Sequence, residues 1–233
     1  MRDRIYVVVF MIVLGLVAAV VLTAANALLK PMYDVNKERE SKGNVLIALG
    51  IEGWNKDRVA AATIDDIKAA FDKSIIERKV RITTPGGAQK DVVYYEGYRT
   101  EAKTSADLIG YAFKITGAGF WDRISGYLAV DAKLETVIGI TFYEDIETPG
   151  LGHKINEPEW QRQFLGRSIY KAGTDTPRLD IVPPSAELKA NQVHAISGAT
   201  ETCTAVQKFT NSQLRDFVIA VKEYTKGDQS SSH

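Results

Sequence analysis

The chain has 233 residues, and its 29 lysines and arginines are matched by 29 aspartates and glutamates, so its formal net charge is zero. A balanced chain has no overall basic field, which argues against generic binding of nucleic acid. Its single cysteine excludes an intrachain disulfide and a cysteine-only zinc or iron–sulfur site. The hydrophobic fraction of 45% is typical of a globular protein rather than a disordered one.

The first element is a long apolar segment. Residues 5–29 contain no charged side chain and consist mainly of valine, leucine, isoleucine and alanine. A bilayer core about 30 Å thick needs about 20 apolar residues in a helix, so this segment is long enough to cross it. A cleaved signal peptide is the alternative, since Ala25-Asn26-Ala27 resembles a cleavage site, but its apolar region normally runs only about 7–15 residues. We therefore expect residues 1–30 to form a membrane anchor helix.

Charge around the anchor does not settle its orientation. Arg2 and Arg4 precede the apolar segment. The basic residues that follow it closely are Lys30, Lys37, Arg39 and Lys42. Counting these charges favours a cytoplasmic C-terminal domain. A very short N-terminal tail followed by a long domain instead favours translocation of the domain. We expect a single-pass protein of the inner (cytoplasmic) membrane with its soluble domain on the periplasmic, outer side.

The next part of the chain is predicted as a stalk and then a small helix and hairpin. Residues 31–44 are polar and alternate in charge, and residues 45–51 form a short apolar patch. Residues 31–62 together are expected to form the stalk with a short helix. Thr63 and Asp66 have the spacing of a capping box, with aspartate in place of glutamate, and predict the start of a helix. Residues 80–95 read as two strands around a turn at Pro85-Gly86-Gly87.

The remaining pattern is richer in strands. Residues 111–116 alternate between apolar and polar side chains, which indicates a half-buried strand, and glycines and aromatics at 117–121 then indicate a loop. The further expected elements are strands at 127–131 and 136–143, a helix at 158–164 and a last helix at 202–226. Hairpin-paired strands with helices at the ends predict an α+β fold with a mostly antiparallel sheet, in one domain over residues 63–233.

One candidate binding loop follows a predicted strand. It runs Glu147-Thr148-Pro149-Gly150-Leu151-Gly152, and its glycines allow the backbone to approach a ligand closely. A second candidate, Ser197-Gly198-Ala199-Thr200-Glu201-Thr202, opens the last predicted helix. Free N–H groups and the positive dipole end at such a helix start favour a phosphate. The hydroxyl of Thr200 or Thr202 is also a candidate for a covalent phosphoester.

Each motif has a plainer interpretation. Taken alone, the first is more typical of a turn, and the second of a helix cap with a tight turn. Trp121, in its glycine-rich loop, fits a core position as well as a ligand contact. The occurrence of these motifs together, in this order, behind one apolar anchor favours the ligand site.

Together these motifs carry a family resemblance. The segments that contribute to it are Asn44-Val-Leu-Ile-Ala-Leu-Gly-Ile51, Phe71-Asp-Lys-Ser-Ile75, Gly119-Phe-Trp121, Tyr143-Glu-Asp-Ile-Glu-Thr-Pro-Gly-Leu-Gly152, Asn156-Glu-Pro-Glu-Trp160, Gln163-Phe-Leu-Gly166 and Ser197-Gly-Ala-Thr200. Over nearly the whole length the chain resembles the C-type subunit of the Na⁺-translocating NADH:quinone oxidoreductase and the related G-type subunit of the Rnf complex. The N-terminal, Gly-Phe-Trp and Asn-x-Pro-x-Trp segments favour the C-type subunit.

The resemblance implies an FMN-binding domain whose flavin is joined through its phosphate to Thr200. It also implies a separate flavin transferase that uses FAD as donor. The phosphate would rest at the start of the helix, after Ser197 and Gly198. It would be held by the N–H groups of Ala199, Thr200 and Glu201, with a further contact from the Thr202 hydroxyl. The isoalloxazine edge would lie against Glu147, Thr148, Gly150, Leu151 and Gly152, and near Trp121. No catalytic residue or metal ligand is implied.

One position departs from the family pattern. The transferase usually recognises a motif with aspartate three residues before the serine, and that position is His194 here. The departure bears on the efficiency of the covalent attachment more than on the fold.

The resemblance implies a membrane-anchored electron-transfer subunit that is inactive alone and works with the other subunits of a redox complex. The chain has no G-x-G-x-x-G motif that opens a helix, so NADH would be oxidised on another subunit. The alternatives are the G-type subunit of an Rnf-type ferredoxin:NAD oxidoreductase and a flavin-free structural subunit. A hydrolase that uses Ser197 or Thr200 with His194 or His153 is a further alternative, although no G-x-S-x-G motif supports it.

Overall fold

The computed structural model describes residues 2–84 and 86–230. Its α-helices are α1 (Arg2–Ala48), α2 (Lys56–Ala61), α3 (Ile64–Ser74), α4 (Pro158–Arg162) and α5 (Thr200–Ser230). Its strands are β1 (Ile75–Thr83), β2 (Gln89–Tyr98), β3 (Leu108–Ala118), β4 (Arg123–Asp131), β5 (Val137–Glu144), β6 (Asp180–Val182) and β7 (Gln192–His194). Two short 3-10 helices complete the set, η1 (Ser105–Asp107) and η2 (Gly152–Asn156).

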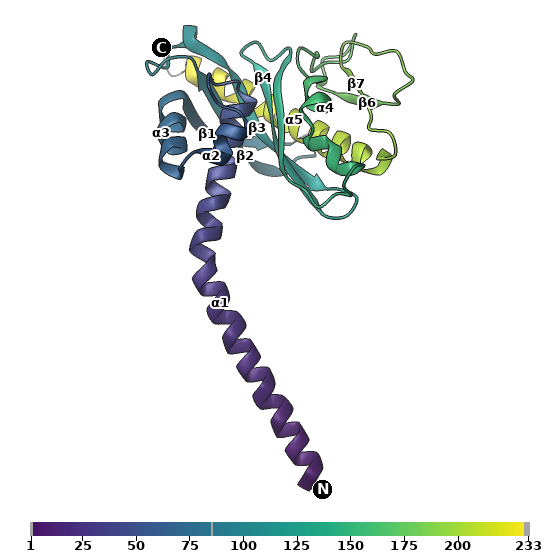
Figure 1. Cartoon of the computed structure of the whole chain (residues 1–233). Helices are drawn as coiled ribbons and strands as arrows, with labels where there is room; N and C mark the ends of the chain where they lie inside the picture. The colour runs from purple at the N-terminus through teal and green to yellow at the C-terminus, as the bar shows by residue number, and fades with distance from the viewer. Residues whose placement is uncertain (1, 85, 231–233) are drawn as a thin grey trace.

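The main sheet has five strands in the order β1-β2-β3-β4-β5, and every neighbouring pair is antiparallel. Each strand therefore pairs with the next one in sequence, because short turns return the chain directly. A separate parallel pair, β6 and β7, lies beside the sheet (Figure 1). The α+β fold with a mostly antiparallel sheet is confirmed.

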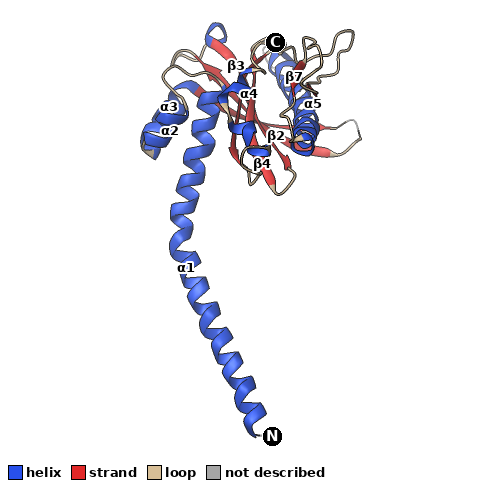
Figure 2. Cartoon of the chain, turned by 45° about the vertical axis from the view of Figure 1, so that its right-hand side comes forward, coloured by secondary structure: helices blue, strands red, loops and turns tan. Residues whose placement is uncertain are grey.

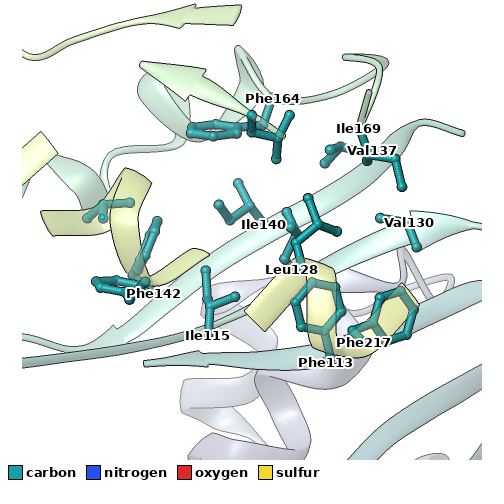
Figure 3. Packing of buried hydrophobic residues seen from close by; sticks show 14 of the residues in the cluster. Phe113, Ile115, Leu128, Val130, Val137, Ile140, Phe142, Phe164, Ile169 and Phe217 are labelled. Carbon is teal, nitrogen blue, oxygen red and sulfur yellow. The ribbon is translucent and has the colours of Figure 1, made fainter. Parts of the chain in front are cut away.

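Helices cover both faces of the sheet. Figure 2 shows α1, α2 and α3 on one side of the strands and α5 on the other. The larger core lies under α5, where the Phe113 ring of β3 stacks on Phe217 of α5 with 4.3 Å between ring centroids. Leu128, Ile140 and Phe142 fill the same layer (Figure 3). Burial on both faces explains why β4 is almost continuously buried along its length.

Helix α1 has two different environments along its length. Its segment from Arg4 is long and apolar enough to cross a membrane, and 0% of the apolar window is buried against the rest of the chain. Near its end, Leu46 is fully buried with Tyr127 and Ala129 of β4. The hydroxyls of Ser41 and Tyr127 are 2.6 Å apart. One continuous helix thus projects from the domain and also contributes to its core (Figure 1).

Several expected elements agree with the structure, and the two shortest strands were missed. The capping box forms, since Thr63 N donates to Asp66 Oδ2 and Asp66 N donates to Thr63 Oγ1, both at 3.2 Å. The hairpin forms as β1 and β2, although Pro85 of its turn lies outside the described residues. Strands β6 and β7 are too short to show a hydrophobic period, so the sequence did not indicate them. Helix α2 lies within residues 31–62, where a short helix was expected.

The direction of β5 places the candidate site. A side chain at Gly139 of β5 would meet the carbonyl of Ala48, whereas Tyr143, near the other end of β5, lines the same cavity as Glu40. Strand β5 therefore runs back along α1 towards the apolar part of that helix. The loop after β5 leaves the sheet at the end that faces the exposed part of α1 (Figure 1).

Candidate functional site

The two candidate binding loops lie against each other. A Cβ atom added at Gly198 would stand 2.9 Å from Cδ2 of Leu151, so the leucine packs directly over the turn before α5. Gly198 has a φ of +80°, a left-handed conformation that favours glycine. Two segments far apart in the sequence, residues 147–152 and residues 197–202, are thereby brought into one site.

The loop between β3 and β4 forms the third side of this site. The backbone N–H groups of Phe120 and Trp121 donate to Glu147 Oε1 at 2.8 and 3.2 Å. The indole Nε1 of Trp121 donates to Thr148 Oγ1 at 3.0 Å, and the tryptophan side chain is 67% exposed. Trp121 therefore does not fill the core, and its ring offers an exposed flat surface beside Thr148.

Glu147 lies at the centre of the three segments, and it is 5% exposed. Its other carboxylate oxygen, Oε2, accepts a hydrogen bond of 2.7 Å from the Thr202 hydroxyl of α5. A Cβ atom at Gly119 would overlap Glu147 Oε1, and one at Gly152 would lie 2.6 Å from both Glu147 Oε2 and Thr202 Oγ1. The two glycines therefore leave the space that the carboxylate fills.

Thr200 and Thr202 have opposite environments at the start of α5. Thr202 is 3% exposed and its hydroxyl is bonded to Glu147, whereas Thr200 is exposed at the first position of the helix. The N–H of Ala199 is already used, since it donates to Ile196 O at 3.1 Å. The first N–H groups of a helix have no partner within that helix, so those of Thr200 and Glu201 remain for an anion.

A polar cluster closes the base of the loop after β5. The buried carboxylate of Asp145 accepts hydrogen bonds from the amide of Asn156 and from the backbone N–H of Glu147, the latter at 3.2 Å. Its Oδ1 lies 2.9 Å from Nδ1 of His153. The sequence alone did not point to this cluster, although Asp145 and His153 directly flank the glycine-rich loop. The amine of Lys56 binds the carbonyl of Asn156 at 2.7 Å, and burial lowers the pKa of this lysine.

His194 ends strand β7, and its ring bonds to the loop that precedes that strand. Its Nε2 lies 3.0 Å from the carbonyl of Ala186, so that nitrogen carries the proton, and its own carbonyl accepts from the indole of Trp160 at 2.9 Å. In the described part of the chain no hydrogen bond joins Ser197 or Thr200 to a histidine. The serine or threonine hydrolase therefore has no structural support.

The arrangement can hold a flat apolar ring and an anion. Apart from α1, the exposed large apolar side chains are few, and most of them surround this site: Phe120, Trp121, Ile146 and Leu151. Apolar surfaces with a few placed hydrogen-bonding groups are typical of cofactor sites. Within the part of the chain that the structure describes, no group of three or more histidine, cysteine, aspartate or glutamate side chains could hold a metal ion.

Comparison with known proteins gives this geometry a context. Residues 119–215 match the FMN-binding domain family. This range includes the loop between β3 and β4 that contains Trp121 (the Trp121 loop), the loop after β5 and the start of α5. The C-type subunit of the Na(+)-translocating NADH-quinone reductase from Haemophilus ducreyi is 28% identical over 225 residues, which cover 84% of this chain and 83% of the relative. Its counterpart from Chlamydia caviae is 36% identical over 136 residues, or 51% of this chain and 43% of that protein.

A solved structure shares the fold. The crystal structure of the C-type subunit of the Na(+)-translocating NADH-quinone reductase from Parabacteroides distasonis superposes with a TM-score of 0.64 at 19% identity, covering 82% of this chain and 95% of the other. The resemblance expected from the sequence is therefore confirmed: this chain is similar along most of its length to the C-type subunits of Na⁺-translocating NADH-quinone reductases, and its residues 119–215 match the FMN-binding domain family.

Proposed function

We propose that this chain is a membrane-anchored electron-transfer subunit of a Na⁺-translocating NADH:quinone oxidoreductase, with FMN bound covalently through its phosphate to Thr200. The relatives that are C-type subunits of this reductase and the FMN-binding domain support this assignment. In such a complex, NADH would be oxidised and quinone reduced on other subunits. The chain would therefore be inactive alone.

The observation that carries the proposal is the contrast between two neighbouring hydroxyls. Thr200 is exposed at the positive end of a long helix, two residues after Gly198, over which Leu151 packs. Thr202 is buried, and its hydroxyl donates a hydrogen bond to Glu147. A transferase can reach only an exposed hydroxyl. Of the two threonines that the sequence offers, Thr200 is the one available for the ester.

The residues present fit FMN. The N–H groups of Thr200 and Glu201 would hold the phosphate, and Ser197 and Gly198, both exposed in the turn before α5, leave room around it. Ala199 would contribute its small side chain rather than its N–H, which is already bonded.

The other end of the cofactor would meet the loops. Trp121 and Leu151 would offer apolar surface to the ring system, and Thr148 a hydroxyl for a polar ring atom. Gly150, with a φ of +77°, and the buried Gly152 would shape the loop that supports them.

When bound, FMN would supply the ability to accept and pass on electrons. The chain's own residues bind and orient it, and the exposed position of Thr200 leaves one side open to redox partners. Attachment would join Thr200 Oγ1 to the phosphorus of the FMN half of FAD, break the phosphoanhydride bond and release AMP, with the hydroxyl proton passing to solvent.

The proposed partners follow from this role. They are the other subunits of the complex, a flavin transferase during maturation, and the lipid bilayer around the apolar half of α1. We propose an inner-membrane location with the soluble domain on the outer side.

In-gel fluorescence tests the proposal. The full chain is co-expressed with a flavin transferase, denatured, and viewed under ultraviolet light. We expect a fluorescent band that Thr200→Ala abolishes and Thr202→Val retains. Thr204→Ala, which removes an exposed hydroxyl one turn further along α5, is the matched control and should also stay fluorescent. A parent chain without fluorescence would contradict covalent attachment. In the same gel, a brighter band for His194→Asp would show that the departure in the recognition motif limits attachment.

A further inference from the structure

The bonds of Glu147 suggest a role different from direct flavin contact. All of the described partners of its carboxylate are donors, namely the N–H groups of Phe120 and Trp121 and the hydroxyl of Thr202. The partners come from two segments, the loop between β3 and β4 and the first turn of α5, and Glu147 itself opens a third. With 5% exposure, the carboxylate has little surface left for a ligand.

An ionised carboxylate is the side chain that satisfies this set of partners. It has two oxygen atoms that only accept, and here one oxygen faces two backbone N–H groups while the other faces a hydroxyl. A glutamine would have to point its NH₂ group either at the backbone N–H groups, where donors would oppose each other, or at Thr202. In the second case the Thr202 hydroxyl would accept a hydrogen bond from the glutamine, and its own O–H would be free to donate to another group.

The surrounding backbone is fitted to the carboxylate. Any side chain at Gly119 or Gly152 would overlap it, and a Cβ atom added at Gly152 would stand only 2.6 Å from Oε2. These close approaches leave no room for a water molecule between the carboxylate and either glycine. The arrangement is therefore a built contact between three segments and not a chance surface approach.

We propose that Glu147 is a positioning residue. It joins the loop between β3 and β4, which contains Trp121, to the first turn of α5 around Thr200. It also keeps the Thr202 O–H directed at its own carboxylate, so that this hydroxyl does not donate to the phosphate. This inference rests on the proposed function, since the segments that Glu147 joins are the ones assigned to the flavin. The negative charge of Glu147 has a second effect: a fixed anion beside the flavin site disfavours the negative charge that reduction adds to the flavin.

Hydrogen exchange of the full-length chain without flavin tests the positioning directly. In Glu147→Gln, the backbone amides of Phe120 and Trp121 should exchange at least about tenfold faster than in the parent, because they lose a charged acceptor. Glu159→Gln, which neutralises an exposed glutamate on α4, is the matched control and should exchange like the parent. Unchanged exchange in Glu147→Gln would overturn the inference.

A second pair of variants protects the test against misfolding of Glu147→Gln. Thr202→Val removes the donor and should speed exchange in the first turn of α5, whereas Thr202→Ser keeps the donor and should restore parental exchange. Equal exchange in these two variants would contradict the hydrogen bond's role.

The flavin-loaded chain provides a readout that a purely structural role would not move. The flavin midpoint potential should shift to more positive values in Glu147→Gln and stay at the parental value in Glu159→Gln. An unchanged or more negative potential in Glu147→Gln would overturn the electrostatic part of the proposal. A parent chain that carries no flavin would overturn the proposed function instead, and the exchange experiment would still decide whether Glu147 joins the segments.

Discussion

Cys203 is the residue whose pH behaviour follows most directly from its place beside the site. It is 3% exposed, and burial raises the pKa of its thiol, even though the N–H of Ile196 donates to Sγ at 3.3 Å and opposes the shift. At pH 8 we expect iodoacetamide to modify the folded chain far more slowly than the urea-unfolded chain, because the thiolate is the reactive form. Equal rates would contradict the burial.

The same shift sets the sign of a stability effect. The folded chain keeps the thiol proton at a pH where the unfolded chain, with an ordinary thiol pKa of about 8.5, has lost it. The contribution of Cys203 to folding is therefore complete below that pH and decreases as the pH rises above it. The free energy of unfolding, measured by urea unfolding, should fall more between about pH 7.5 and 9.5 in the parent than in Cys203→Ala. These two pH values lie on either side of the ordinary thiol pKa of about 8.5.

Individual site residues show how far the sequence alone could lead. Ser197, Thr200, Thr148 and Leu151 were expected in one site, and the structure brings their segments together. The sequence assigned Glu147 to the flavin edge and the Thr202 hydroxyl to the phosphate. Their mutual hydrogen bond was not foreseeable, because it depends on how two distant segments meet, and no local pattern encodes that distance.

At the scale of elements, α1 shows that one helix serves two purposes. Its last turns pack in the core, where Leu46 is fully buried, whereas its first part is exposed. The sequence indicated an anchor and an apolar patch at 45–51, but not that one helix, which includes Pro31, continues from the anchor to Ala48. The division of the chain at residues 30 and 62 stays a prediction.

A cavity-forming substitution tests the packing of this helix end. Leu46→Ala should lower the free energy of unfolding by about 2–5 kcal/mol, because it removes buried methyl groups and leaves a cavity. Leu165→Ala, at a leucine that is 49% exposed, should change it by less than about 0.5 kcal/mol. Denaturation of the full chain in detergent measures both. A small effect at Leu46 would mean that α1 is not part of the domain core.

For the whole molecule, the proposed flavin site lies on the side from which α1 leaves the domain. Strand β5 runs back towards the apolar half of α1, and the site lies at its end (Figure 1). If α1 crosses the bilayer as proposed, the exposed Trp121 and Leu151 would lie on the membrane side of the domain. Electron transfer to a subunit embedded in the same membrane would then cover a short distance.

Membrane insertion of α1 can be tested with a charge. Val17→Arg should oppose insertion by about 2.5–3.5 kcal/mol, and should move part of the chain from the membrane pellet to the fraction released by alkaline carbonate. Asp34→Arg introduces the same side chain on the exposed surface of α1 beyond the apolar segment and should leave the chain in the pellet. Release of the parent chain, which carries neither substitution, by alkaline carbonate would contradict the insertion of α1 into the membrane.

The attachment of FMN to Thr200 is the central claim, and fragmentation mass spectrometry of the mature chain tests it most directly. The peptide that contains Ser197 to Thr202 should be heavier than its sequence by the mass of FMN less one water, and the fragments should locate the added mass on Thr200. An unmodified peptide from fully matured protein, or an added mass located on Ser197 or Thr202, would contradict the account.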